Sequence, residues 1–231
     1  MSVRHNENQE LQIEEILNPD CDKFREAVRI YLNAFPLDER MDTVGIERFI
    51  MVPKRPGHDH FWVLLWKNEV VGMAMFSYLA QSNLGFGYYL AVKEEHRNKG
   101  IGSWMLQQMR WQVNEDAQAS GNPTAWGVCG EVERVADGTT ETERTLRARR
   151  ISSYKRHGGI CLPVDYLCRP MRKNGAEEWY TLMLFPANTL HDGLGKAQVR
   201  DIILAILLDI YEVPFDSKYV TIALNSLNEV R

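Results

Sequence analysis

A glycine-containing turn between an apolar strand and an amphipathic helix constrains the fold of this chain more than any other feature. Residues 87–92 are apolar and aromatic, as in a strand, and the polar residues 93–99 follow them. Beyond Gly100-Ile101-Gly102, apolar residues recur every four positions and predict a helix to about residue 119: Ile101, Met105, Met109 and Val113. A strand that leads through such a turn into a helix indicates a mixed α/β domain.

The glycines make this turn a candidate phosphate site. The first turn of a helix leaves backbone N–H groups without partners, and these groups and the helix dipole favour an anion. Gly100 and Gly102 lack the Cβ atoms that would hold a phosphate away, and Arg97 and Lys99 add cationic donors. A Walker loop needs an earlier glycine, and a Rossmann fingerprint needs a third one. The alternative is an ordinary strand-to-helix loop in which glycine only permits the turn.

The segment resembles the acetyl-CoA signature of the GNAT acetyltransferases, R/Q-x-x-G-x-G/A, which Arg97, Gly100 and Gly102 match. The resemblance implies an α/β fold with a mostly antiparallel sheet, a parallel splayed central strand pair, and flanking helices. It also implies that the turn holds the pyrophosphate of acetyl-CoA, while the preceding strand pairs with the pantetheine arm. The residues assigned in this way to acetyl-CoA are Leu90, Ala91, Val92, Arg97, Asn98, Lys99, Gly100, Ile101, Gly102 and Ser103.

A second match to the family lies at Tyr154. Members commonly carry a tyrosine near the end of a later helix, in a pattern like lYek-GF. This chain reads Ser-Tyr-Lys-Arg-His-Gly-Gly over residues 153–159, with Gly159 in place of the usual phenylalanine. The resemblance implies that Tyr154 protonates the departing CoA thiolate. The alternative is a packed tyrosine whose hydroxyl reaches the surface.

Two glutamates on a predicted strand are candidates for the base. Holding a lysine-like amine of pKa about 10.4 neutral at pH 7 costs about 4.6 kcal/mol, at roughly 1.36 kcal/mol per pH unit, so a base helps the reaction. Glu131 and Glu133 lie two positions apart and therefore share a face of the strand. We prefer Glu131, which is closer to the expected splay. The alternatives are solvent-facing carboxylates, or carboxylates that bind a cationic acceptor without acting as bases.

The sequence therefore predicts an N-acetyltransferase that moves an acyl group from acetyl-CoA to a primary amine by direct attack. The acceptor is a small-molecule or protein amine, and the acidic pair favours a small cationic one. Two other functions stay open. A non-catalytic acyl-CoA sensor needs only the phosphate loop, and a nucleotide-binding protein would use the same loop for ATP.

Periodicity and turn residues predict the remaining elements and the domain limits. Helices are expected at 22–34, 44–51, 142–156 and 196–211, and strands at 61–66, 70–78, 124–132, 160–167 and 179–185. We expect a flexible N-terminus over residues 1–15, a GNAT-type domain over 16–190 and a C-terminal helical extension over 191–231. The extension carries an apolar stripe that needs cover from this domain or from a homodimer partner: Val199, Ile202, Ile203, Ile206 and Ile210.

Composition narrows the other possibilities. A net charge of -4 without a concentrated basic surface argues against general nucleic-acid binding. The basic run 144–156 is expected to be a solvated helix face; the alternatives are a site for the CoA 3′-phosphate or an acidic partner, or ion pairs with Glu131, Glu133, Glu141 or Glu143. The longest apolar run, 202–208, is far shorter than the roughly 20 residues of a membrane helix. Four scattered cysteines and no signal peptide favour a reduced, cytoplasmic location. His58-Asp59-His60 is expected to be a solvated turn, so we expect no metal.

Overall fold

A sheet of nine strands organises the part of the chain that the computed structural model describes, namely residues 4–6, 11–55, 57–170, 175–188 and 194–229. The strands follow the order β1-β2-β3-β4-β5-β6-β9-β7, and β8 pairs with β9 beside β7. Only β5 and β6 run parallel among these pairs. The strands are β1 Arg4–Asn6, β2 Leu11–Glu15, β3 Asp59–Trp66, β4 Glu69–Leu79, β5 Leu84–Val92, β6 Gly127–Glu133, β7 Ile160–Cys161, β8 Tyr166–Cys168 and β9 Glu178–Pro186.

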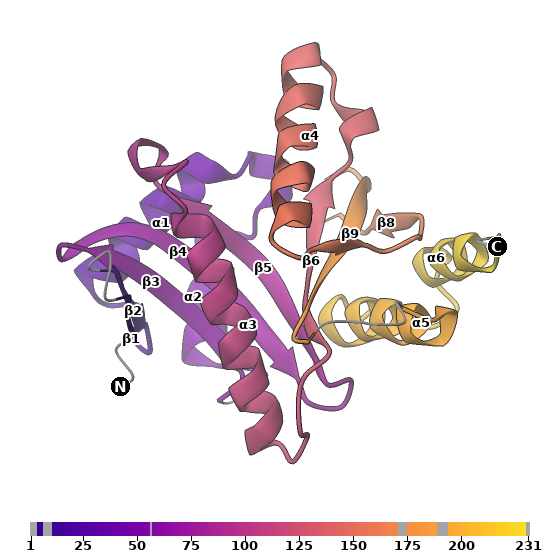
Figure 1. The fold of residues 1–231 in the computed structure, drawn as a ribbon, viewed down its shortest axis with the longest axis horizontal. Helices are drawn as coiled ribbons and strands as arrows, with labels where there is room; N and C mark the ends of the chain where they lie inside the picture. The colour runs from indigo at the N-terminus through magenta and orange to yellow at the C-terminus, as the bar shows by residue number, and fades with distance from the viewer. Residues whose placement is uncertain (1–3, 7–10, 56, 171–174, 189–193, 230–231) are drawn as a thin grey trace.

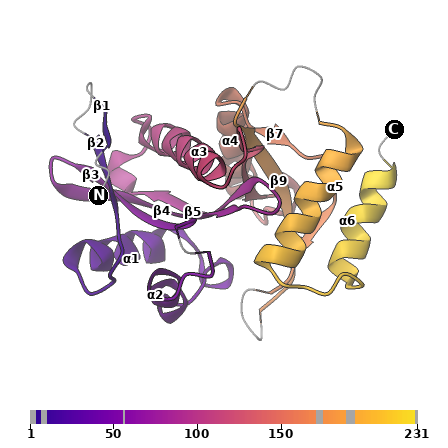
Figure 2. The same cartoon turned by 90° about the horizontal axis from the view of Figure 1, so that it is seen from below.

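Helices cover both faces of the β2–β5 half of the sheet (Figures 1 and 2). The helices are α1 Asp22–Ala34, α2 Thr43–Met51, α3 Ile101–Ala119, α4 Glu141–Arg156, α5 Lys196–Leu204 and α6 Lys218–Glu229. Alternate residues of β3 point to opposite faces. Phe61 and Val63 pack with α1 and α2, whereas Trp62 and Leu64 pack with α3. The central strands are therefore buried on both sides.

The C-terminal helices cover the other half of the sheet, around β6, β8 and β9 (Figure 1). A π-helical segment, Ala205–Ile210, continues α5. The apolar stripe of α5 and this segment is buried in one cluster with Phe86, Cys129 and Leu184 of the sheet. Side chains from α6, including Val220 and Leu227, join the same cluster. The extension thus shares a core with the strands before it.

A bulge on β5 opens the middle of the sheet. Strands β4 and β5 pair Met75 with Tyr89 and Phe76 with Gly87, so Tyr88 is an extra residue. A bulge of this kind bends a strand and increases its twist. The parallel pairing with β6 stops at the same place, at Gly87 and Gly130. Beyond it the two strands diverge, which confirms the splayed parallel pair expected from the sequence.

Most elements lie where the sequence predicts them, with corrections near both ends. The strand expected at 160–167 is divided into β7 and β8, because Pro163 cannot donate to a ladder. Within residues 1–15, where a flexible N-terminus is predicted, the described residues form β1 and β2, and β2 pairs with β3 along its full length. Helix α6 was not anticipated. No helix among the described residues combines the length and apolar character needed to cross a membrane.

Candidate active site

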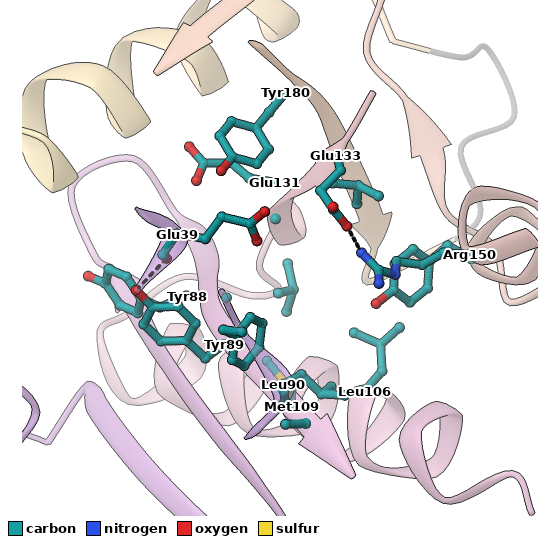
Figure 3. A pocket seen from close by; sticks show the side chains of 18 of the residues that line it. Glu39, Tyr88, Tyr89, Leu90, Leu106, Met109, Glu131, Glu133, Arg150 and Tyr180 are labelled. Carbon is teal, nitrogen blue, oxygen red and sulfur yellow. Dashed lines mark hydrogen bonds and ion pairs between the residues drawn. The ribbon is translucent and has the colours of Figure 1, made fainter. Parts of the chain in front are cut away.

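The diverging ends of β5 and β6 enclose a pocket of about 460 Å³. We call it the central pocket. Its walls come from β5, β6 and β9, from α3 and α4, and from the connection between α1 and α2. Figure 3 shows its side chains, with carboxylates and tyrosines at one end and the apolar Leu90, Leu106 and Met109 at the other. The pocket therefore lies where the bulge on β5 interrupts the β4 register and where the pairing between β5 and β6 ends.

The glycine turn, residues 97–103, lies at the apolar end of the central pocket, which Arg97 and Val92 line. Gly100 caps α3 with a left-handed φ of 78°, which glycine adopts without strain. A Cβ built on Gly100 would meet no atom within 4 Å. The N–H of Trp104 makes the first bond of the helix, to the Gly100 carbonyl at 2.9 Å. The N–H groups of residues 101–103 precede this bond, and a helix leaves such first-turn donors without internal partners, as an anion site requires.

The other predicted phosphate ligands are partly occupied by contacts within the protein. The Nε of Arg97 donates to the Val92 carbonyl at 3.1 Å, and the Lys99 ammonium lies 5.6 Å from the centre of the Trp66 ring. Asn98 takes a left-handed φ of 62°. The side chain of Ile101 is buried in the core under α3, so only its backbone is available to a ligand. Gly102 and Ser103 complete the first turn of α3.

Strand β5 presents to the central pocket an edge that has no strand partner among the described residues. Tyr89 to Val92 pair with β4 on one side but have no partner in β6 on the other. The backbone of Leu90, Ala91 and Val92 therefore lines the pocket together with their side chains. An extended chain with amide groups can bond to such an edge, as a further strand would.

Tyr154 lies in the wall of the central pocket, on the last turn of α4. Its ring packs edge-on against Phe185 of β9, with ring centroids 5.4 Å apart. Burial raises the pKa of the Tyr154 hydroxyl above its usual value. The group therefore keeps its proton at neutral pH, the state that a proton donor needs.

Glu131 is held by two tyrosines. The hydroxyls of Tyr166 and Tyr211 each donate to one of its carboxylate oxygens, both at 2.6 Å. Burial raises the pKa of Glu131, and these two hydrogen bonds oppose the rise. Tyr211 follows the π-helical segment, so the C-terminal extension contributes a residue that orients a side chain of the central pocket.

Glu133 is engaged by the basic helix α4. Its carboxylate pairs with Arg147 at 3.2 Å and also with Arg150, as the dashed line in Figure 3 shows. Arg144 pairs with Glu141 on the same helix. The basic run is thus partly an ion-pair network, and the two candidate bases, equivalent in sequence, have different partners.

Glu39 is a third carboxylate of the central pocket, and no motif in the sequence singles it out. It ends a short 3-10 turn, Leu37–Glu39, between α1 and α2. Burial raises the pKa of Glu39 to about 7, and the nearby charges of Glu133 and Glu178 add to the rise. Local sequence carries no sign of this placement, because Glu39 meets the pocket through folding over long separations.

His60, from the His58-Asp59-His60 segment considered as a metal motif, has side-chain partners within the protein. His60 is buried in β3 rather than solvated, and its ring nitrogens bond Glu15 at 3.1 Å and Asp116 at 2.9 Å. Within the described residues, one other group could bring metal ligands together: Glu69, Glu95 and His96, within 4.8 Å of one another. The Glu69 carboxylate already pairs with Lys93. The absence of a metal stays a prediction.

Comparisons with known proteins bear on the fold and on the turn. The model of the acetyltransferase (GNAT) family matches residues 22–125, which span α1, the glycine turn and α3. The match ends before β6 and α4, so it covers the phosphate end of the central pocket and little of the acidic end. No curated protein matches the chain.

Solved structures share the fold at low sequence identity. A protein assigned as a GNAT-family acetyltransferase from Bacteroides thetaiotaomicron superposes with a TM-score of 0.61 and 18% identity, over 87% of this chain and 99% of its own. The ribosomal-protein-S18-alanine N-acetyltransferase from Escherichia coli gives 0.51 and 13%, over 80% and 99%. A GNAT acetyltransferase from Elizabethkingia anophelis with acetyl-CoA bound gives 0.48 and 15%, over 77% and 98%. These likenesses show the fold alone.

Proposed function

The chain belongs to the GNAT superfamily of acetyltransferases, and from this membership we propose that it transfers an acyl group from acetyl-CoA to a primary amine by direct attack. Family and fold support acyl transfer from an acyl-CoA in general. The amine acceptor and the roles of individual residues are our proposal. The observation that carries it is one central pocket, lined both by Arg97, in the turn before α3, and by an acidic cluster of Glu39, Glu131 and Glu133.

Each part of acetyl-CoA has a matching surface in this proposal. The diphosphate binds the N–H groups of the glycine turn, where the helix dipole and the nearby cations Arg97 and Lys99 favour it. Asn98 and Ser103 flank the same site. The pantetheine arm lies along the unpaired edge of β5 beside Leu90 and Val92. The thioester then reaches the part of the pocket where Tyr154 and the carboxylates lie.

The reaction needs one base and one acid. The lone pair of the neutral amine attacks the thioester carbon, a C–N bond forms, and the oxyanion accepts a bond from a main-chain N–H of the Leu90–Val92 segment. The C–S bond then breaks, and Tyr154 donates its proton to the thiolate of CoA. Acidic side chains around the acceptor end favour a cationic amine: Glu39, Glu131, Glu133 and Glu178.

Release of free CoA thiol tests this function. Purified protein is given acetyl-CoA with spermidine, lysine, kanamycin or a lysine-containing peptide, and thiol is followed over time. We expect release that depends on an amine, with the acetylated amine detected by mass spectrometry. Binding of acetyl-CoA without thiol release would favour the sensor, and thermal stabilisation by ATP but not by CoA would favour the nucleotide-binding protein.

A further inference from the structure

The three carboxylates at the acidic end of the central pocket differ in what already binds them. Glu131 accepts hydrogen bonds from two tyrosine hydroxyls, and Glu133 pairs with two arginines. Glu39 has neither a hydrogen bond nor an ion pair to its carboxylate within the described parts of the chain. A base must have an accessible lone pair and must release its proton again near neutral pH. Glu39 meets the first condition best.

We propose that Glu39, at the turn between α1 and α2, is the general base that takes the proton of the acceptor amine. This inference rests on the proposed function and assigns its missing step. In Figure 3 the Glu39 side chain extends from the edge of the central pocket into the space that Glu131 and Glu133 border. Glu131, held by the hydroxyls of Tyr166 and Tyr211, instead orients the acceptor amine.

The turn that carries Glu39 is fixed to the strand proposed to hold the thioester arm. The hydroxyl of Tyr89, on β5, donates to the Glu39 carbonyl at 3.2 Å and accepts from the N–H of Met41 at 2.9 Å. Tyr31 donates to the Met41 carbonyl at 3.0 Å. A base positioned from two sides loses little freedom when it meets its substrate. Tyr89 is therefore a positioning residue for Glu39.

The charges around Glu39 come from every neighbouring element. Glu133 on β6 and Glu178 on β9 disfavour its ionised form, whereas Arg147 and Arg150 on α4 favour it. Glu131, Tyr154 and Tyr180 also face the pocket. Burial is the largest influence, and together these groups bring the pKa of Glu39 to about 7. At that value, a carboxylate exists at neutral pH and still accepts a proton from an ammonium more readily than an ordinary glutamate does.

The proton balance of the reaction follows. The ammonium of the acceptor loses one proton to the Glu39 carboxylate, directly or through one water, and becomes the nucleophile. Attack forms the C–N bond and leaves a positive charge on the nitrogen, which loses its second proton to solvent. The C–S bond breaks, and the expelled thiolate takes its proton from Tyr154. The proton on Glu39 leaves to solvent and Tyr154 regains one, so the protein returns to its initial state. No redox partner is involved.

The pH dependence of kcat/KM tests the proposal, with thiol release from acetyl-CoA and the fastest amine of the panel above. The unaltered protein is expected to gain activity as pH rises through about 7. Glu39→Gln is expected to lower kcat/KM by roughly 10²- to 10³-fold and to remove that inflection, leaving only the titration of the amine itself. Glu39→Asp is expected to restore part of the rate and the inflection. Asp38→Asn, an exposed carboxylate on the same turn, serves as the matched control and is expected to change neither.

Three outcomes decide between the possibilities. If Glu39→Gln keeps both the rate and the inflection, Glu39 is not the base, and the proposed acetyltransferase function is unaffected. Loss of the inflection in Glu131→Gln, with the inflection kept in Glu39→Gln, transfers the role to Glu131. Thiol release that no amine stimulates in the unaltered protein removes the proposed function itself. Calorimetric binding of CoA to Glu39→Gln, expected to equal that of the unaltered protein, separates a lost base from a damaged fold.

Discussion

At the scale of single residues, Tyr154 offers a clean separation of chemistry from packing. Its ring packs on Phe185, so Tyr154→Phe keeps that contact and removes only the hydroxyl. We expect kcat to fall about 10²-fold or more, while the affinity for acetyl-CoA changes by less than about twofold. Steady-state kinetics and calorimetry measure the two quantities. Tyr219→Phe, on α6, is the control, and an unchanged kcat in Tyr154→Phe would remove this residue from the mechanism.

Gly102 allows a similar test of the phosphate site. A Cβ at this position would lie 3.8 Å from Leu90 and Val92, an ordinary contact, so the backbone there accommodates a Cβ. Gly102→Leu is expected to weaken CoA binding at least about tenfold, because the side chain fills the space proposed for the diphosphate. Its unfolding free energy should be equal or up to about 1 kcal/mol higher, since glycine disfavours helix. Gln107→Leu on the exposed side of α3 should leave the affinity unchanged, and full affinity in Gly102→Leu would contradict the site.

The sequence predicts the site residues that stand in local motifs, but not the roles of those whose partners lie far away in the chain. Arg97, Gly100 and Gly102 lie within six positions of one another, and Tyr154 stands in a short pattern of its own, so a reader of the chain can select them. Glu131 and Glu133 cannot be ranked in that way. Their difference depends on partners from α4 and from beyond residue 200. Glu39 lies in the connection between α1 and α2, and no sequence motif around it predicts that it lines the central pocket.

At the scale of elements, a buried charge network joins β2, a strand that the sequence does not predict, to β3 and α3. His60 of β3 lies between Glu15 of β2 and Asp116 of α3, and Gln112 donates to the other oxygen of Asp116 at 2.6 Å. Burial alone would lower the pKa of His60, but the bonds to Asp116 and Glu15 raise it to about 9. The imidazolium therefore ties together three elements.

This network predicts how stability depends on pH. The pKa of His60 is higher in the folded than in the unfolded chain, so its contribution is complete below about pH 6.5 and is lost as pH rises through about 9. We expect the unfolding free energy to fall by on the order of 3 kcal/mol over that range. Urea titrations at several pH values measure it. The fall should persist in the exposed-site control His157→Gln and vanish in His60→Gln, and its persistence in the latter would assign it to other groups.

The accuracy of the element predictions follows the strength of their periodicity. Helix α1 was placed at its observed limits because its apolar spacing is regular and Pro36 follows it. Strand β2 has only the short alternation of Leu11 and Ile13 among polar residues, which falls within a segment dominated by charge and amide groups. The bulge at Tyr88 has no sequence signature, because it arises from the register of two strands.

At the scale of the whole molecule, the C-terminal extension and the strands share one apolar cluster. Ile206 is fully buried in it, together with Leu182 and Leu184 of β9. Ile206→Ala is therefore expected to lower the unfolding free energy of the entire chain by about 2–5 kcal/mol, in a single transition. Circular dichroism and tryptophan fluorescence should give coincident curves. Leu146→Ala, an exposed leucine on α4, should have little effect, and a separate early transition would show an extension that folds independently.

The extra residue at Tyr88 has a consequence for how this protein can vary. The opening between β5 and β6 depends on the number of residues between two hydrogen-bonded registers, and much less on which side chains stand there. Substitutions can therefore reshape the walls over long times while the gap persists. Deleting one residue from β5 would remove the bulge and give β5 and β4 one continuous register. Strands β5 and β6 would then pair further along their length and close the space where the substrate is proposed to lie. The shape of the pocket therefore depends more on the number of residues in β5 than on their identity.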